Sequence, residues 1–253
     1  MSSTASDSIA GRVAVVVGAA GGIGRAITAR LARAGCHLAL VDVVGDALDE
    51  VARGVGLEGS GLACCADITD WEQVERTASD VQERFGQVHI LVNTAGINTK
   101  QRTLADLSPE QWERVVAVNL NGAFHCVRAF LPIMKESGGG IVVNIVSAAA
   151  WLVSAGAGTH YCAAKRALLS LTESINIEQG RHGIRACAIC PGEVVTPLVN
   201  HRPEPPSAER LAAMLRPEDV AEAVHYVVTR PSRVTVSELT IFPSSQISGR
   251  FVV

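Results

Sequence analysis

The chain has 253 residues, of which 48% are hydrophobic and 19% charged, so it is too apolar for a disordered chain and has the length of one large α/β domain or two smaller ones. Its 22 lysines and arginines are matched by 25 aspartates and glutamates, and only 4% of its residues are aromatic, which argues against a nucleic-acid partner. The apolar runs are shorter than the ~20 residues of a membrane-spanning helix, so no membrane partner is expected.

Residues 1–9 are rich in serine and lack the basic start and apolar stretch of a secretory signal. We predict a flexible tail there and a single folded domain over residues 10–253. The seven cysteines are scattered, and Cys187 and Cys190 lie in an apolar run that predicts a strand, where residues three apart face opposite sides. Reduced thiols in a cytoplasmic protein are therefore favoured over a disulfide or a metal site.

Short apolar runs alternate with segments of helical periodicity along the whole chain. The runs predict strands at residues 13–17, 37–41, 61–65, 88–92, 141–146, 184–190 and 239–242. Helices are expected after the capping-box pattern Thr69-x-x-Glu72, at Ser108-Pro109, after Tyr161 and after Pro217. The alternation predicts an α/β fold: a single doubly wound (Rossmann-like) domain with a parallel sheet of about seven strands and helices on both faces.

The first strand runs into a glycine-rich turn that includes Gly18, Gly21, Gly22, Ile23 and Gly24. Glycines let the backbone turn sharply and approach a ligand, and the following helix points its N-terminal amides at a pyrophosphate. A tight turn that merely packs the helix on the sheet is the alternative. Because the turn directly follows the first strand, a dinucleotide site is favoured.

Asp42 ends the second strand, 18 residues beyond Gly24. A carboxylate at this place accepts hydrogen bonds from both adenosine ribose hydroxyls and repels a 2′-phosphate, which favours NAD over NADP. A solvated aspartate at a strand end is the alternative. Arg25, the cation nearest the turn, belongs to the helix and is expected to point away.

The third and fourth predicted strands also end in residues that suit a ligand. Asp67-Ile68 and Asn93-Thr94-Ala95-Gly96 leave room for the adenine and the nicotinamide ribose, and Asn93 is expected to brace neighbouring backbone groups. Each signal is weak by itself. Both segments follow strands of a doubly wound sheet, however, and such sheets bind ligands outside their carboxyl ends.

Ser147 follows the fifth strand, and Tyr161 and Lys165 are four residues apart on one face of the next helix. A nearby ammonium is expected to lower the pKa of the phenol from its ordinary ~10 toward the working pH. Tyr161 could then exchange a proton with a carbinol oxygen, to which Ser147 would also hydrogen-bond. A partly buried tyrosine beside a surface lysine is the alternative.

In order and spacing, these motifs resemble those of the short-chain dehydrogenase/reductase (SDR) family. The matching segments cover residues 12 to about 242 and are Val17-Gly18 through Gly22-Ile23-Gly24, Asn93-Thr94-Ala95-Gly96, Val118-Asn119-Leu120-Asn121, Ser147, Tyr161-x-x-x-Lys165 and Pro191-Gly192-x-Val194-x-Thr196. Val17 and Thr94 replace the family's usual Thr and Asn, both in bracing roles. Residues 234–246 lack its common glycine pair.

The resemblance implies a catalytic tetrad. Tyr161 would be the acid/base, and Lys165 would hold the nicotinamide ribose and tune Tyr161. Ser147 would position the substrate oxygen, and Asn119 would anchor a water in a proton relay, with a helix-kinking polar residue as the alternative for Asn119. The implied cofactor contacts are Gly18, Gly22, Ile23, Gly24, Asp42, Asp67, Ile68, Asn93, Ala95, Gly96, Tyr161, Lys165, Pro191, Gly192, Val194 and Thr196.

The substrate is expected to meet residues 148–158, Glu193 and the Pro-rich loop 197–216. Three neighbouring residues offer an apolar wall: Trp151, Leu152 and Val153. Three arginines of the loop either meet an anionic group or are solvated: Arg202, Arg210 and Arg216.

The chain is therefore predicted to be an oxidoreductase that transfers a hydride between NAD(H) and a small-molecule secondary alcohol or ketone. Two alternatives remain: an NADPH-dependent ketone or 3-oxoacyl reductase, and a catalytically weak dinucleotide-binding regulator on the same fold. The resemblance also implies a homotetramer, or else a homodimer, that pairs helices 111–134 and 160–179. The second helix carries a small-residue stripe that suits close packing on a partner or on the chain's own sheet: Ala163, Ala167, Ser170 and Ser174.

Overall fold

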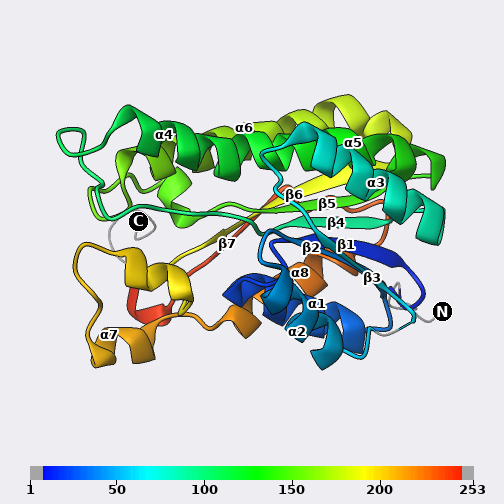
Figure 1. The fold of residues 1–253 in the computed structure, drawn as a ribbon, viewed down its shortest axis with the longest axis horizontal. Coiled ribbons are helices and arrows are strands. Elements are labelled where there is room, and N and C mark those ends of the chain that lie inside the picture. The colour runs from blue at the N-terminus through cyan, green and yellow to red at the C-terminus, as the bar shows by residue number, and fades with distance from the viewer. Residues whose placement is uncertain (1–7, 58, 247–253) are drawn as a thin grey trace.

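The computed structural model describes residues 8–57 and 59–246. One sheet of 7 parallel strands has the order β3-β2-β1-β4-β5-β6-β7 (Figure 1). The strands are β1 (Val13–Val17), β2 (His37–Asp42), β3 (Leu62–Cys65), β4 (Ile90–Asn93), β5 (Gly140–Ile145), β6 (Ile184–Pro191) and β7 (Glu238–Ile241). Strand order reverses between β1 and β4, so the predicted doubly wound sheet is confirmed, and the crevice at this reversal is the expected ligand site.

Helices cover both faces of the sheet (Figure 1). One face carries α1 (Gly22–Arg33), α2 (Gly45–Gly54) and α8 (Pro217–Val228). The other carries α3 (Trp71–Phe85), α4 (Pro109–Val116), α5 (Ala123–Glu136) and α6 (Thr159–Gln179). The short α7 (Ala208–Ala213) belongs to the predicted substrate loop. Among the described residues, we find no helix that combines the length and the apolar character needed to cross a bilayer.

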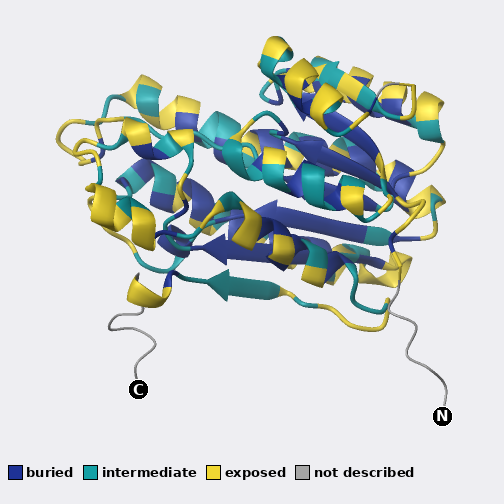
Figure 2. Ribbon diagram, turned by 90° about the horizontal axis from the view of Figure 1, so that it is seen from below, coloured by how far each residue is buried: buried dark blue, intermediate teal, exposed yellow. Residues whose placement is uncertain are grey.

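The central strands are apolar because both of their faces are covered, whereas the edge strands β3 and β7 are only partly buried. In β1 every residue is buried: Val13, Val15 and Val17 pack in the cluster of α3 and α5, and Ala14 and Val16 pack in that of α1 and α8. Figure 2 shows the buried central strands between helices whose outer surfaces are exposed. Cys187 and Cys190 lie on β6 as predicted, and burial raises the pKa of both thiols to about 12.

The N-terminal end of the domain differs from the prediction at one residue. Ile9, assigned to the tail, is 3% exposed and packs in the same core cluster as Ile27. Its carbonyl accepts a hydrogen bond from the backbone N–H of Arg12. The folded domain therefore includes Ile9, whereas residues 1–7 of the predicted tail lie outside the described residues.

The start of α3 corrects a second prediction. Its N-cap is Asp70, whose carboxylate accepts hydrogen bonds from the backbone N–H groups of Glu72 and Gln73. Thr69, predicted as the cap, instead donates to Asp67 through both its hydroxyl and its N–H. The capping box expected from Thr69 and Glu72 is therefore wrong, because aspartate satisfies the free amides of the first turn equally well.

Candidate active site

The glycine-rich turn joins β1 to α1 at the carboxyl edge of the sheet. At Gly18, where φ is +77°, a Cβ would lie 2.6 Å from the backbone nitrogen of Ala95, and at Gly24 it would meet the Gly18 carbonyl oxygen at 2.0 Å. Only glycine fits either position. The first turn of α1 has no side-chain cap and no acidic residue. Such a cradle of backbone at a helix N-terminus fits the pyrophosphate of a dinucleotide.

Asp42 lies beside this turn at the end of β2. Its Oδ2 accepts a hydrogen bond from the N–H of Ala20 at 2.9 Å, and its Oδ1 accepts one from the N–H of Val44 at 3.1 Å. The carboxylate is therefore held in place and partly exposed. The expectation that Arg25 points away from the turn is wrong: its Nε donates to the carbonyl of Ala20, inside the turn, at 2.9 Å. Its Nη2 contacts the carbonyl of Ala47 and the carboxylate of Glu50.

The polar residue after β4 braces the turn from the other side. The hydroxyl of Thr94 donates to the carbonyl oxygens of Val17 and Gly18, at 2.8 and 3.0 Å. Asn93 was expected to brace backbone groups, but its Nδ2 donates to the side chain of Asn144, which in turn donates to Thr172. That expectation is therefore corrected: Asn93 joins a buried side-chain network between β4, β5 and α6.

One cavity of about 590 Å³ opens at the carboxyl edge of the sheet. Its lining includes Ile23, Gly96, Ser147, Tyr161, Lys165, Pro191, Gly192, Val194 and Thr196, all of them predicted site residues. Thr196 also lies over the glycine turn, since a Cβ on Gly22 would be 3.1 Å from its Cγ2. Other predicted residues lie outside this lining, namely Gly18, Gly22, Gly24, Asp42, Asp67, Ile68, Asn93, Ala95 and Asn119.

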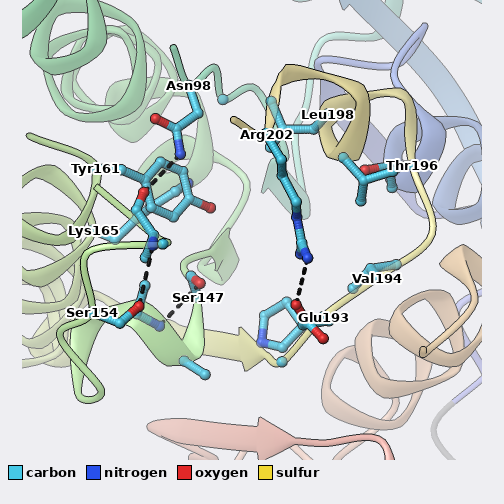
Figure 3. A pocket seen from close by; sticks show the side chains of 18 of the residues that line it. Asn98, Ser147, Ser154, Tyr161, Lys165, Glu193, Val194, Thr196, Leu198 and Arg202 are labelled. Atoms are coloured by element: carbon cyan, nitrogen blue, oxygen red, sulfur yellow. Dashed lines mark hydrogen bonds and ion pairs between the residues drawn. The ribbon is translucent and has the colours of Figure 1, made fainter. Parts of the chain in front are cut away.

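Tyr161, Lys165 and Ser147 lie on one side of this cavity (Figure 3). Lys165 is 3% exposed, donates from Nζ to the carbonyl of Ile145 at 2.9 Å, and lies 5.7 Å from the centroid of the Tyr161 ring. The Oγ of Ser147 accepts a hydrogen bond from the N–H of Ala149 at 3.1 Å, which leaves its O–H to donate. The sequence prediction that brought these side chains together thus agrees with their placement.

Asn119 lies where the helix between α4 and α5 widens into a π-helical segment, Ala117–Gly122. Its side-chain amide is fully buried, accepts from the N–H of Ile97 at 2.7 Å and donates to the carbonyl of Ile97 at 3.0 Å. A Cβ on Gly96 would be 3.5 Å from Asn119 Oδ1 and 3.4 Å from Lys165 Nζ, so both groups border the same glycine. Isolated π-turns of this kind are frequent at functional sites.

The pKa of Tyr161 is raised above its ordinary value. Burial disfavours the tyrosinate, and this outweighs the hydroxyl of Ser147 and the charge of Arg102, which favour it. Burial also lowers the pKa of Lys165 to about 8. The expectation that the pKa of the phenol is lowered toward the working pH is therefore wrong. Burial of Tyr161 raises this pKa by more than the groups beside it lower it.

A family model described as short chain dehydrogenase matches residues 12–206. The chain belongs to the short-chain dehydrogenase family. It is an NAD(P)-dependent oxidoreductase that acts on a CH–OH or ketone group, so the regulator alternative is not favoured.

Relatives of this dehydrogenase differ in substrate. This chain is 39% identical to a D-beta-hydroxybutyrate dehydrogenase of Rhizobium meliloti over 194 residues, which are 74% of this chain and 73% of the relative. The structure of a 3-ketoacyl-(acyl-carrier-protein) reductase from Brucella melitensis complexed with NADH has a TM-score of 0.85 and 29% identity, covering 95% of this chain and 100% of that one. An alcohol dehydrogenase from Thermococcus sibiricus complexed with 5-hydroxy-NADP has a TM-score of 0.83 and 32% identity, covering 94% and 99%.

The substrate side of this dehydrogenase differs in part from the prediction. Leu152 and Val153 line the cavity, but Trp151 is absent from its lining. The indole N–H of Trp151 instead donates to Glu238 at 2.9 Å, and the guanidinium of Arg166 stacks on its ring. Nothing in the sequence around Trp151 indicated this contact with β7.

Sequence analysis missed Arg102, which lines the cavity of the dehydrogenase although it belongs to none of the motifs. The one available signal was its position on the segment that follows β4, at the ligand-binding edge of the sheet. Of the predicted loop cations, Arg202 and Arg210 line the cavity, whereas Arg216 lies outside its lining and is exposed at the start of α8.

Proposed function

We propose that this enzyme transfers a hydride between NAD(H) and a secondary alcohol or ketone, with Tyr161 as the acid/base. The observation that carries the proposal is the shared cavity, in which Tyr161, Ser147 and Lys165 face residues that border the glycine turn. When bound, the nicotinamide supplies the hydride acceptor or donor. A panel of alcohols and ketones, assayed with each cofactor by nicotinamide absorbance, tests the proposal.

Each side chain of the site has a separate role in the proposed reaction. Ser147 donates a hydrogen bond to the substrate oxygen, and Tyr161 removes the hydroxyl proton during oxidation or returns it during reduction. The buried Lys165 holds the nicotinamide ribose. Asn119, fixed on both backbone groups of Ile97, orders a water beside Lys165 through which the proton reaches solvent.

The cofactor residues have distinct roles in the proposal. The turn from Gly18 to Gly24 and the start of α1 hold the pyrophosphate. Asp42 binds the adenosine ribose, and the segment Asp67-Ile68 borders the adenine. The nicotinamide end meets Gly96, Pro191, Gly192, Val194 and Thr196, while Asn93 and Ala95 support the strand end beneath it.

The choice of NAD over NADP rests on Asp42. Its carboxylate would repel the 2′-phosphate of NADP, so we expect NAD to bind more tightly. The change Asp42→Ala should narrow the difference between the two affinities. Titration of protein fluorescence with NADH and NADPH measures both dissociation constants. Tighter binding of NADPH by the wild-type enzyme would contradict this role and would favour the NADPH-dependent alternative.

We also propose that the enzyme is a homotetramer, with a dimer as second choice. The stripe on α6 lies on an outer face: Ala163 and Ser170 are exposed, and Ala167 and Ser174 are partly so. The stripe therefore does not pack on the chain's own sheet, and its small side chains allow a partner helix to approach closely. The scattered cysteines continue to favour a cytoplasmic location.

We expect Ala167→Trp to weaken the assembly, because a two-fold contact places the bulky ring at each interface twice. Light scattering at micromolar concentration measures the mass of the wild-type and variant proteins. The exposed Ala213, on α7 and away from the stripe, gives Ala213→Trp as a control that should keep the wild-type mass. A wild-type mass near the monomer's 26.5 kDa would rule out both oligomers.

A further inference from the structure

The cavity has a charged side opposite its catalytic side. Arg202, Arg210, Glu193 and the exposed Glu204 line it. Arg102 also lines the cavity, but it lies near the start of α6, and its charge acts on both Tyr161 and Arg202. In Figure 3, Arg202 extends toward Glu193 on the side of the pocket across from Tyr161, Lys165 and Ser147. These five charged side chains carry three positive charges and two negative charges, and Glu204 forms no ion pair within the described part of the chain. Tyr161 and the pair of Arg202 and Glu193 thus lie on opposite sides of one cavity.

Arg102 carries a buried charge that no carboxylate neutralises within the described part of the chain. It is 5% exposed. Its guanidinium donates to three carbonyl oxygens, those of Thr99 and His201 at 2.9 Å each and that of Gly156. These carbonyls come from three different segments around the cavity and fix the guanidinium in place. Buried charges in proteins are normally paired, so an uncompensated one at a ligand cavity points to an anionic ligand.

Arg202 adds a second positive charge beside the first. Its Nη1 lies 2.7 Å from Glu193 Oε1, but Arg210 already binds both oxygens of Glu193, at 2.8 and 3.1 Å. Such a two-bond pair neutralises the carboxylate by itself. Arg202 therefore shares a carboxylate that Arg210 already binds, and the two arginines carry one positive charge more than Glu193 neutralises. It also repels Arg102, whose pKa is lowered by burial and by the charge of Arg202.

A purely structural role explains only part of this arrangement. The pair of Glu193 and Arg210 holds α7 against the segment after β6. It does not require a second arginine on Glu193, nor a buried arginine next to that second one. Two neighbouring positive charges in a cavity raise the electrostatic energy of the folded protein, and an anion bound beside them lowers this energy.

We propose that the substrate of this enzyme carries a carboxylate, which binds Arg202 on the side of the cavity across from Tyr161, with the nearby charge of Arg102 adding to the attraction. The proposal rests on the proposed function. A planar carboxylate matches the fork of a guanidinium, and Arg202 can turn to it while Arg210 keeps Glu193 neutral. Leu152, Val153 and Leu198 also line the cavity and suit a short aliphatic chain.

The first test compares an acid with its neutral ester. The probes are 3-hydroxybutanoate, 3-hydroxyhexanoate and their methyl esters, oxidised with NAD at pH 8. We expect the wild-type enzyme to have the higher kcat/KM for the acids. Arg202→Met should lower kcat/KM for the acids by about 10- to 100-fold, the usual worth of a hydrogen bond to a charged group, and leave the esters within about threefold. Arg216→Met, which removes a charge of the same loop outside the cavity, should retain the wild-type preference.

The second test measures binding without turnover, so that the two proposals can fail separately. Butanoate and hexanoate, with butanamide and hexanamide as neutral matches, are titrated by calorimetry into wild-type and Arg202→Met enzyme in the presence of NADH. Carboxylate binding that Arg202→Met weakens supports the inference even if no alcohol in the panel is oxidised. Equal affinity for acids and amides, or binding unchanged by Arg202→Met, overturns it and leaves the role of Tyr161 intact.

Discussion

Replacement of Tyr161 by phenylalanine should lower turnover at least ~10²-fold, the usual contribution of a general acid/base group. The change keeps the ring that lies beside Lys165 and removes only the hydroxyl group, whose proton the reaction exchanges. The affinity for NADH, measured by fluorescence titration, should barely change. The chain's other tyrosine provides a matched control: Tyr226 is exposed on α8, and Tyr226→Phe should leave turnover unchanged. Near-normal turnover of Tyr161→Phe with an identified substrate would exclude Tyr161 as the acid/base.

The raised pKa of Tyr161 also predicts how turnover depends on pH. Oxidation needs the tyrosinate as base, so kcat for oxidation should rise with pH throughout the range below that pKa. Reduction needs the protonated phenol and should not share this rise. Tyr161→Phe should abolish the pH dependence of oxidation that arises from this group, whereas Tyr226→Phe should retain it. A wild-type oxidation rate that is independent of pH below 9 would contradict the assignment.

The sequence was enough to predict features that are determined by residues close together in the chain. Strand β1 follows from an unbroken apolar run, and the glycine turn after it follows from a steric need that only glycine meets. The placement of Tyr161 and Lys165 follows from helical spacing alone. These features depend on residues close together in the chain, so a single sequence is enough to find them.

The features that the sequence did not predict depend on distant segments. The pKa of Tyr161 is set by the packing around it, which no spacing along α6 reveals. The position of Arg102 depends on carbonyls of Gly156 and His201, which tertiary folding brings to it. The turn of Trp151 toward Glu238 on β7 has the same origin. Side-chain spacing predicts which residues share a face, and packing decides which of them meet.

Lys165 provides the second large expected effect, because the charge that serves the reaction in the proposed function destabilises the fold through its burial. It is 3% exposed, and burial lowers its pKa from 10.5 to about 8. Below about pH 8 the folded enzyme therefore holds a buried ammonium at a cost. Between about pH 8 and 10.5 the unfolded chain binds a proton that the folded enzyme lacks, so the free energy of unfolding rises with pH across this window.

The change Lys165→Met keeps the aliphatic length and removes the charge. We expect turnover to fall by at least ~10²-fold, because the ribose and Tyr161 lose their cationic neighbour. At pH 7 the melting temperature, measured without cofactor, should nevertheless rise by a few degrees, since about 1 kcal/mol corresponds to roughly 2–4 °C in a domain of this size. This gain should shrink as the pH is raised from 8 to 10, because the wild-type enzyme then sheds the same charge.

The exposed Lys135, in the last turn of α5, gives Lys135→Met as the control. Its removal costs only the small attraction between a cation and a helix C-terminus, so the melting temperature should not rise at any pH. A melting temperature of Lys165→Met that falls at pH 7 would mean that the bond from Nζ to the carbonyl of Ile145 outweighs the burial of the charge. In that case Lys165 would stabilise the fold as well as serve catalysis, and the opposition between the two roles would be wrong.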